Sequence, residues 1–273
     1  MSSFDYYQAA VNASPDHVIP ALLEMYPYAS VDHEKATNGY DRACVIHRGD
    51  NKLLRVQWGG NTGDLTQIRG TGENAPQCAE SIRELWPEHR LQRADVCEDY
   101  SEEGVWETLS DYALYLAEQH SIKIDQRGDW ARNDQMGKGR TLYLGSRQSL
   151  AYLRVYEKGK EKAVRSGGEC VDPHHVRAEA EIKPQNKVQG FALSKLQPAE
   201  YWGCSPWLLQ YSSILFQKNM ERIRLWNVSK RSNDDMAFDF MLKQYGAVIA
   251  RQIAANGQDH VIARIIESTK GKL

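Results

Sequence analysis

The residues best suited to chemistry are acidic side chains on segments that read as β-strands. Residues 176–183 (VRAEAEIK) alternate between an apolar face and a charged face that carries Glu179 and Glu181 side by side. Two adjacent carboxylates repel each other when they are partly desolvated, and a divalent cation removes that repulsion. Asp95 stands on another predicted strand, with Asp99 just beyond it. Oxygen donors of this kind suit Mg²⁺ or Mn²⁺, so the pattern indicates a carboxylate metal site.

The same strand also allows an interpretation without a metal. Arg177 and Lys183 flank the two glutamates on the charged face, so the four side chains could form ion pairs on a solvated surface. His174 and His175 precede the strand and could ligate a metal or carry a proton, or could serve only in a turn. The residues alone leave these alternatives open.

Tyrosine is the second residue type with a candidate role, and the chain has 14 of them. A tyrosine hydroxyl can attack a DNA phosphodiester and keep the 5′ phosphate as a covalent ester, which preserves the bond energy for rejoining. The tyrosines nearest the charged strands in the sequence are Tyr143, Tyr152, Tyr156 and Tyr201. Composition does not choose between them.

Antiparallel strands and amphipathic helices must position these residues. Alternating apolar and polar residues predict half-buried strands at residues 43–47, 53–58, 91–97, 140–144, 151–156 and 176–182. Helical spacing predicts helices at residues 75–86, 103–120, 206–226, 234–256 and 258–268. This order predicts an α+β fold, in which an antiparallel β-sheet of two related halves has helices packed on one face. We place an α+β domain at residues 1–197 and a helical C-terminal region at residues 198–273, with a linker over residues 184–198.

Composition is that of a soluble globular protein. The chain has 273 residues, of which 41% are hydrophobic and 26% charged, and this length can bury a core of its own. No apolar run is long enough for a membrane span, and the N-terminus lacks the features of a signal peptide, so we expect a cytoplasmic protein with no membrane partner. The five cysteines are odd in number and contain no Cys-x-x-Cys pair, which argues against a disulfide framework and a structural zinc site.

Charge is distributed unevenly along the chain, although the net charge is only −2. Residues 1–120 carry 9 Lys and Arg against 20 Asp and Glu, whereas residues 121–273 carry 25 against 16. Residues 127–165 contain ten basic and four acidic residues. Such a segment can bind phosphates even when the average charge is near zero, although it could also be a solvated loop region with scattered charges.

Several of these segments together resemble the Rep-trans replication initiation factors. Residues 139–149 (GRTLYLGSRQS) and 154–159 (RVYEKG) are similar to the central motifs of that family, and the acidic strand at 177–183 follows at the expected place. Upstream, residues 93–96 (RADV) with Asp99 are similar to the family's Arg-x-Asp strand. The first of these stretches is fairly specific, whereas the acidic strands alone are not.

Further segments extend the resemblance and narrow it to one branch. Residues 70–72 look like the family's earlier glycine turn. Residues 198–207 (PAEYWGCSPW) and 244–246 (QYG) resemble the filamentous-phage branch of a family that also includes plasmid initiators and relaxases of integrative elements. The resemblance spans about residues 40–250.

The resemblance implies a rolling-circle DNA replication initiator that acts in a bacterial host cell. Such an endonuclease nicks one strand of an origin with a divalent metal and leaves a 5′-phosphotyrosine and a 3′-hydroxyl primer. Carried over by position, Asp95, Glu179 and Glu181 become metal ligands for Mg²⁺ or Mn²⁺, and Lys183 steadies the carboxylates or the scissile phosphate. The basic residues that become DNA contacts are Arg140, Arg147, Arg154, Lys158 and Arg177. The implied partner is origin DNA, as an extruded hairpin or a melted single strand, with a host helicase and a homodimer as further candidates.

The nucleophile is where this chain departs from the family's pattern. In plasmid members the tyrosine follows the Glu-x-Glu strand by a few residues, but here no tyrosine lies between Lys183 and Tyr201. We therefore predict Tyr201 as the nucleophile and Tyr156 as the second candidate. Three rival functions remain: a DNA-binding regulator with the initiator fold but no nicking activity, a metal-dependent nuclease that uses water, and a structural protein with a surface ladder of ion pairs.

Overall fold

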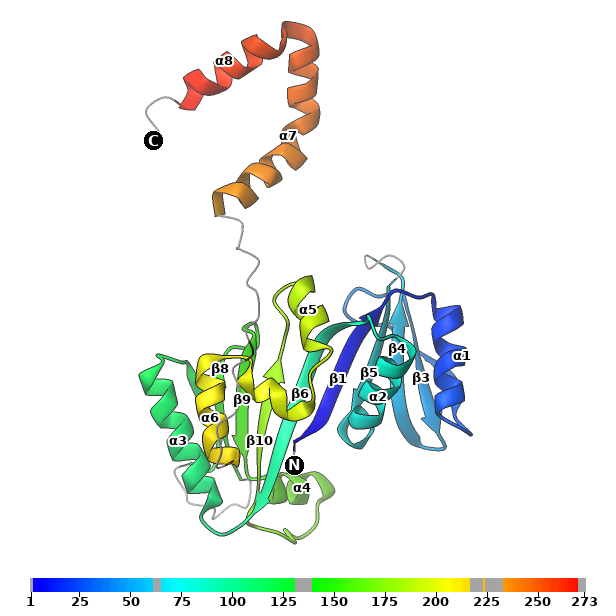
Figure 1. The fold of residues 1–273 in the computed structure, drawn as a ribbon, viewed down its shortest axis with the longest axis vertical. Coiled ribbons are helices and arrows are strands. Elements are labelled where there is room, and N and C mark those ends of the chain that lie inside the picture. The colour runs from blue at the N-terminus through cyan, green and yellow to red at the C-terminus, as the bar shows by residue number, and fades with distance from the viewer. Residues whose placement is uncertain (1, 61–64, 131–138, 217–222, 224–232, 270–273) are drawn as a thin grey trace. The chain divides into compact units, whose positions relative to one another are not determined.

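One antiparallel sheet of ten strands organises most of the chain (Figure 1). The computed structural model describes residues 2–60, 65–130, 139–216, 223 and 233–269. The chain divides into two compact units, Met1–Trp226 and Asn227–Leu273. The sheet lies in the first unit, and its strands follow the order β2-β3-β4-β5-β1-β6-β10-β9-β8-β7.

The sheet consists of two halves with the same order of elements. The first half comprises β1 (Ser3–Val11), α1 (Pro15–Met25), β2 (Ser30–Glu34), β3 (Arg42–Arg48), β4 (Asn51–Trp58), β5 (Thr66–Thr71) and α2 (Ala75–Leu85). The second half comprises β6 (Arg90–Ser101), α3 (Val105–Gln119), β7 (Ile124–Gly128), β8 (Arg140–Gly145), β9 (Ala151–Tyr156), β10 (His175–Ile182) and α5 (Lys187–Leu193). It also has an inserted helix, α4 (Lys158–Ser166), between β9 and β10. Because β1 and β6 pair with each other at the centre, the two halves mirror each other in strand order.

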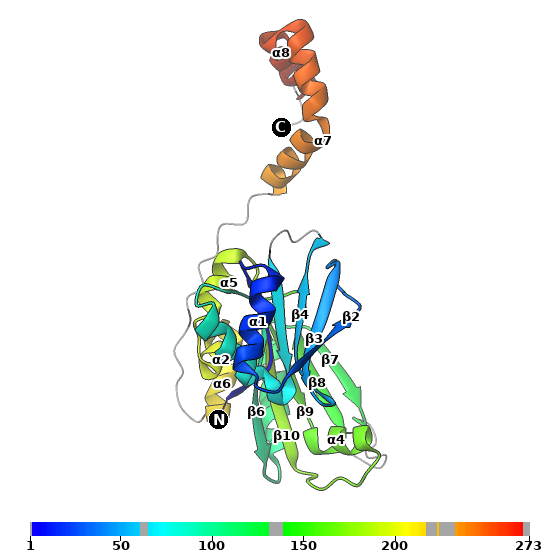
Figure 2. The ribbon, with the colours of Figure 1, turned by 90° about the vertical axis from the view of Figure 1, so that its right-hand side faces the viewer.

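Helices cover one face of this sheet and leave the other face open. Figures 1 and 2 show α1, α2, α5 and α6 (Pro206–Phe216) on the same side of the strands. The alternation along β10 explains this arrangement, because Val176, Ala178, Ala180 and Ile182 are at most 1% exposed within the hydrophobic core. The residues between them, which include Glu179 and Glu181, face the opposite side. The open face is therefore the polar face on which the predicted site residues must meet.

The segment after α5 packs against the centre of the covered face. The short helix η3 (Pro198–Gly203) contacts β1, β6 and β10, and it begins with a capping box formed by Gln197 and Glu200. It places Tyr201 and Trp202 in the core, where neither side chain is exposed. In the same core, the buried Tyr7 hydroxyl lies 2.7 Å from Nε2 of His89. The covered face is thus closed by large aromatic residues.

The predicted α+β fold, with a sheet, helices packed on it and helices at the C-terminus, is confirmed. Each of the six predicted strands is present, as β3, β4, β6, β8, β9 and β10. The periodicity did not predict α1, which contains a proline at its start and a second, Pro20, inside it. The predicted linker contains α5, whose first turn is capped by the side chain of Asn186, an acceptor for the backbone N–H of Gln189. Of the helix predicted at residues 206–226, α6 occupies the first part, and residues 217–222 and 224–226 lie outside the described residues.

The second unit is helical. It contains α7 (Asn233–Asn256) and α8 (Gln258–Thr269), separated by Gly257, whose φ of 83° is readily adopted only by glycine. Both helices expose apolar side chains, among them Tyr245 and Ile266. Within the described part of the chain, no helix combines the length and the apolar character that a membrane crossing requires.

Acid should weaken the contact between α2 and β1 at His89. Burial lowers the pKa of His89, whose Nδ1 contacts the carbonyl oxygen of Trp86 at 2.8 Å. The unfolded chain therefore takes up this proton at higher pH than the folded chain, so stability is intact above about pH 6.5 and falls as the pH drops below it. We expect the melting temperature to fall further between about pH 7.5 and pH 5.5 in the wild type than in His89→Asn. Equal losses in the two proteins would exclude this histidine as the cause.

Candidate functional site

A pocket of about 280 Å³ opens on the uncovered face, at the centre of the sheet. Its walls come from both halves: β1, the end of β5, β6, β9, β10 and the turn between β8 and β9. The lining residues are Asp5, Tyr6, Thr71, Gly72, Arg93, Asp95, Arg147, Tyr152, Arg154, Glu179 and Glu181. The structure thus brings together the three predicted metal ligands and two of the predicted DNA contacts.

Strand register positions the three carboxylates. Asp95 on β6 lies directly opposite Glu181 on β10, and Glu179 lies one pleat further along β10, opposite Cys97. The three acidic residues are only 3–6% exposed. The carboxylates are close together because β6 pairs with β10, although Asp95 and Glu181 are 86 residues apart in the sequence. Alternation within each strand could not reveal this pairing.

Each carboxylate is bound by a cation in this structure. Arg93 donates to Oδ1 of Asp95 at 2.7 Å and also lies 2.9 Å from Oε2 of Glu181. Arg154 donates to Oε2 of Glu179 at 2.7 Å, and Nζ of Lys183 lies 2.7 Å from Oε1 of Glu181. The predicted pairing of Glu181 with Lys183 is therefore present, whereas Arg177 pairs elsewhere.

Burial makes the ionised form of this cluster costly despite its three cations. Burial raises the pKa of Asp95 to about 7, although the adjacent Arg93 acts to lower it; Glu179 and Glu181 raise it further. The buried Oε1 of Glu181 has no hydrogen-bond partner with acceptable geometry.

An all-oxygen donor set of this kind fits Mg²⁺ or Mn²⁺ in its chemistry. The side chains, however, are turned toward their arginines, and no group of three or more His, Cys, Asp or Glu residues in the described ranges is arranged to hold a metal. A bound cation would have to draw the three carboxylates away from Arg93 and Arg154.

The turn between β8 and β9 brings a further cation and a tyrosine to the rim of the pocket. Gly145, at φ 95°, opens the turn, and Nζ of Lys183 donates to the backbone carbonyl of Arg147 at 3.0 Å. The guanidinium of Arg147 lies 5.4 Å from the ring centroid of Tyr152. Tyr152 stands opposite Glu181 in the β9–β10 register. Partial burial raises the pKa of Tyr152, while Arg147 acts to lower it.

The two tyrosines predicted from the sequence are placed differently. Tyr201 lies in the core of the covered face, where its hydroxyl donates to the backbone carbonyl of Leu193 at 2.6 Å and burial raises its pKa well above the ordinary value. It packs edge-on against Phe4 and cannot reach DNA without unfolding of that core. Tyr156 does reach the cluster, since its hydroxyl lies 3.4 Å from Oε2 of Glu179, but it is only 3% exposed and burial raises its pKa strongly.

Tyr6 is a site residue that sequence reasoning missed. It lines the pocket from β1, opposite Asp95, and its ring centroid lies 4.3 Å from the guanidinium of Arg93. Its hydroxyl donates to Oε1 of Gln8 at 2.6 Å. The signal that could have revealed it was a strand prediction for residues 3–11, which the interrupted alternation there did not provide.

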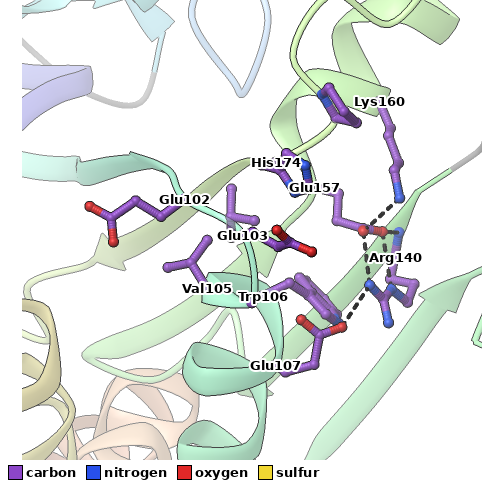
Figure 3. Close-up of a pocket in the computed structure, with 12 residues that line it drawn as sticks. Glu102, Glu103, Val105, Trp106, Glu107, Arg140, Glu157, Lys160 and His174 are labelled. Carbon is purple, nitrogen blue, oxygen red and sulfur yellow. Dashed lines mark hydrogen bonds and ion pairs between the residues drawn. The ribbon is translucent and has the colours of Figure 1, made fainter.

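Arg140 lies on the covered face instead of the open one, because it has the parity of the core residues Leu142 and Leu144. It borders a separate pocket of about 440 Å³ beside the start of α3 (Figure 3). There its guanidinium binds Glu157 at 2.9 Å and Glu107 at 3.3 Å and stacks over Trp106. The DNA contact predicted for Arg140 is therefore not compatible with its position.

The remaining predicted DNA contacts lie on or near the open face but already have acidic partners. Arg177 binds Asp99 at 2.7 Å and Asp5 at 2.6 Å, and Nε2 of His175 also lies 3.0 Å from Asp99. Nζ of Lys158 lies 2.8 Å from Glu161 and 5.2 Å from the ring centroid of Tyr156. Arg177 and Lys158 therefore lie beside Tyr156, and neither lines the pocket, although Arg177 binds the lining residue Asp5.

Arg140 and Arg147 should respond to substitution in opposite ways. Burial alone would raise the pKa of Glu157, but hydrogen bonds from Arg140 and Lys160 outweigh it and hold that pKa below its ordinary value. Arg140→Gln breaks this buried ion pair and should lower the free energy of unfolding by about 3 kcal/mol in urea denaturation. Arg147→Gln should change it by less than about 0.5 kcal/mol, because this side chain is exposed.

The two variants should also differ in their affinity for DNA. Arg147→Gln should weaken binding of single-stranded DNA, whereas folded Arg140→Gln should bind as the wild type does. Loss of affinity in the folded Arg140→Gln variant would contradict the assignment of this residue to the covered face.

Comparison with known proteins agrees with this architecture. Residues 106–231 match the model of the family described as "Replication initiation factor". No curated protein has a matching sequence. Among solved structures, the fold is similar to that of the rolling circle replication initiator protein from Geobacillus stearothermophilus, with a TM-score of 0.50 and 15% sequence identity over 85% of this chain and 90% of that one. The part of the chain that carries β8, β9, β10, Arg147, Tyr152, Glu179 and Glu181 therefore matches the replication initiation factor family.

Proposed function

We propose that this protein initiates rolling-circle DNA replication by nicking one strand of an origin through a covalent tyrosine ester. The observation that carries the proposal is the pocket on the open face, where Asp95, Glu179 and Glu181 meet Arg147 and a tyrosine. The match of residues 106–231 to replication initiation factors supports it, because that segment supplies two of these acids. The similar fold of a rolling circle replication initiator supports it further.

Tyr152 is the nucleophile that the geometry favours. A nucleophile must reach a phosphate that enters from solvent, and Tyr152 lines the pocket and is only partly buried. The guanidinium of Arg147 lies 5.4 Å from the ring centroid of Tyr152 and acts to lower the pKa of its hydroxyl, against burial, which raises it. Tyr6 also lines the pocket, but its hydroxyl is engaged as a donor to Oε1 of Gln8. Tyr201 is enclosed in the core, so Tyr152 replaces it in this proposal.

The reaction is a transesterification at phosphorus. The phenolic oxygen of Tyr152 forms a bond to the phosphorus atom and the bond from phosphorus to the 3′-oxygen breaks, which leaves a 5′-phosphotyrosyl end and a 3′-hydroxyl. The Tyr152 proton passes to solvent, and the leaving oxygen takes a proton from water. Asp95, Glu179 and Glu181 would hold a divalent metal, which would supply positive charge for the phosphate oxygens in the transition state. Joining is the reverse reaction, with a 3′-hydroxyl as the attacking group.

The basic side chains around the pocket orient the DNA strand. Arg147 is exposed at the rim, and its backbone is held by Lys183, so its guanidinium is positioned to bind the scissile phosphate. Arg93 and Arg154 would be released from their carboxylates if a metal took those ligands, and they would then be available to phosphates. Binding should therefore weaken with rising salt concentration, as counterions compete for the phosphates.

A DNA-binding regulator that lacks nicking activity is the second candidate. One observation favours it: Arg93, Arg154 and Lys183 already neutralise the three carboxylates in this structure, so the cluster is stable without a metal. The two candidates differ in one product, the covalent link between the protein and a DNA 5′ end.

Nicking should depend on both the carboxylates and a divalent ion. We expect pure protein with Mn²⁺ to convert a supercoiled plasmid that carries the DNA flanking its own reading frame into an open circle with protein on one 5′ end. Glu179→Gln and Glu181→Gln should each reduce the rate by about 100-fold or more, since each would remove a ligand of the metal whose positive charge would stabilise the transition state. Gel-shift affinity for the same DNA should stay within a few fold. An unaffected nicking rate in both variants would refute the carboxylate site, and no nicking by the wild type would favour the regulator.

Substitution of single tyrosines should identify the nucleophile. Tyr152→Phe should eliminate the covalent adduct on a denaturing gel, because it removes only the attacking oxygen. Tyr143→Phe is the matched control, since Tyr143 stacks on Tyr152 with ring centroids 5.7 Å apart but does not line the pocket. An adduct that persists in Tyr152→Phe and disappears in Tyr6→Phe or Tyr156→Phe would transfer the role to that residue.

A further inference from the structure

We propose that a second pocket, on the N-terminal half of the open face, binds phosphates of the DNA strand that will end in the new 3′-hydroxyl. This basic pocket has a volume of about 130 Å³ and is lined by Glu34, Val45, Lys52, Leu53, Leu54, Arg55, Arg69 and Thr71. The assignment of a strand polarity rests on the proposed nicking function, whereas the assignment of phosphate binding rests on the pocket itself.

The basic pocket occupies the place in the first half of the sheet that the carboxylate site occupies in the second. Tyr6 and Asp95 face each other across the central strand pair, and we take the pseudo-twofold axis that relates the two halves to pass between them. The outer neighbour of Asp95 is Glu181 on β10, and the outer neighbour of Tyr6 is Thr71 on β5. Glu179 lies two residues before Glu181 on β10, and Arg69 lies two residues before Thr71 on β5. Residues two apart on a strand share a face, so both Glu179 and Arg69 are on the open face.

The equivalence extends to the next strand. Arg154 on β9 lies opposite Glu179, and Arg55 on β4 lies opposite Arg69. Both halves therefore have an arginine at this position, Arg154 in one and Arg55 in the other. The residue that faces it differs, because Glu179 in the second half corresponds to Arg69 in the first. The first half of the sheet thus has the arginine pair Arg55 and Arg69 where the second half has Arg154 bound to Glu179.

Charge in the basic pocket suits an anion. Its lining contains the three cations Lys52, Arg55 and Arg69 against the single carboxylate of Glu34, which binds Nζ of Lys52 at 2.5 Å and Nη1 of Arg55 at 2.6 Å. Two positive charges of the lining are therefore not balanced within it. Among the described residues, the Nε atom of Arg55 is also buried without a hydrogen-bond partner. A phosphodiester would supply both the charge and the acceptor.

The two pockets are adjacent along the sheet. Thr71 lines both of them, so a strand that leaves the carboxylate site across β1 and β5 enters the basic pocket. From β6 to β4 there are three strand spacings of about 4.8 Å, or roughly 14 Å. At about 3.4 Å per stacked nucleotide, this distance corresponds to about four nucleotides.

In-line geometry gives the polarity of that strand. Tyr152 attacks from β9, on one side of the carboxylates of β10 and β6. The bond that breaks lies opposite the attacking oxygen, so the 3′-oxygen leaves toward β1 and β5. The nucleotides attached to that oxygen therefore lie over the first half of the sheet, and the basic pocket retains the primer end after cleavage.

Binding of a fluorescein-labelled 15-mer of oligothymidylate tests phosphate binding without any cleavage. Lys52→Gln/Arg69→Gln should raise the dissociation constant about tenfold at low salt. It should also reduce the slope of log affinity against log salt by about 1.4, since each lost single-strand phosphate contact contributes about 0.7. Arg69→Lys retains the charge and should keep most of the affinity.

Arg42→Gln is the matched control for this experiment. Arg42 is exposed and has the parity of the core residues Cys44 and Ile46, so it lies on the opposite face of the neighbouring strand. It should bind the oligonucleotide as the wild type does. Unchanged affinity and salt slope in folded Lys52→Gln/Arg69→Gln, with unfolding midpoints checked, would overturn the proposal. If the double variant does not fold, Arg69→Gln alone applies the same criterion with a slope change of about 0.7.

A second measurement tests the polarity once the nick site is mapped on the plasmid. Neutral methylphosphonate linkages two to four nucleotides on the 5′ side of the nick should weaken binding to the wild type, but not to Lys52→Gln/Arg69→Gln. The same linkages on the 3′ side should weaken binding to both proteins. Equal weakening of both proteins by the 5′ linkages would refute the assigned strand. Failure of nicking leaves the oligothymidylate result intact, so the two proposals fail separately.

Discussion

Burial of three carboxylates at the centre of a sheet is the constraint on which the open face depends. Asp95, Glu179 and Glu181 are almost withdrawn from water, and such acids are tolerated only when cations or protons compensate them. Arg93, Arg154 and Lys183 provide that compensation, and burial still raises the pKa of Asp95 to about 7. The same withdrawal of three carboxylates from water that makes the cluster costly for the fold makes it suited to a divalent cation.

Hydrophobic packing on the covered face offsets the free-energy cost of burying these carboxylates. The same packing keeps the strands in register. Tyr201, Trp202 and Tyr211 fill the space beneath β1, β6 and β10 with fully buried aromatic rings. A one-residue slip of β10 would move its two glutamates into that core, so the packing that excludes Tyr201 from catalysis also fixes the site. Tyr201 thus has a structural role at the position where the sequence suggested chemistry.

The sequence predicted the sheet, its polar face and the three acids, because alternation within a strand reports which side chains share a face. The sequence could not show on which face of the sheet Arg140 lies. Alternation divides the residues of a strand between two faces, but it does not say which face the helices cover. It also missed Tyr6, because residues 3–11 alternate imperfectly and β1 is recognisable mainly from its pairing with β5 and β6. No repeat is visible in the sequence, yet the two halves share one topology, since topology depends on strand order and not on residue identity.

Under the proposed function, that shared topology would let one sheet separate cleavage from retention of the cleaved strand. A nicking enzyme must weaken one bond while it holds the DNA on both sides of that bond, and the two tasks require opposite charges on the protein. Two equivalent positions on a twofold-like sheet satisfy both requirements, because one can carry Glu179 and the other Arg69 without any change in backbone geometry. The acidic average of residues 1–120 conceals this difference, since three of the cations in that segment, Lys52, Arg55 and Arg69, line one pocket of the open face. Net charge along the sequence is therefore a poor guide to which half of the sheet contacts DNA.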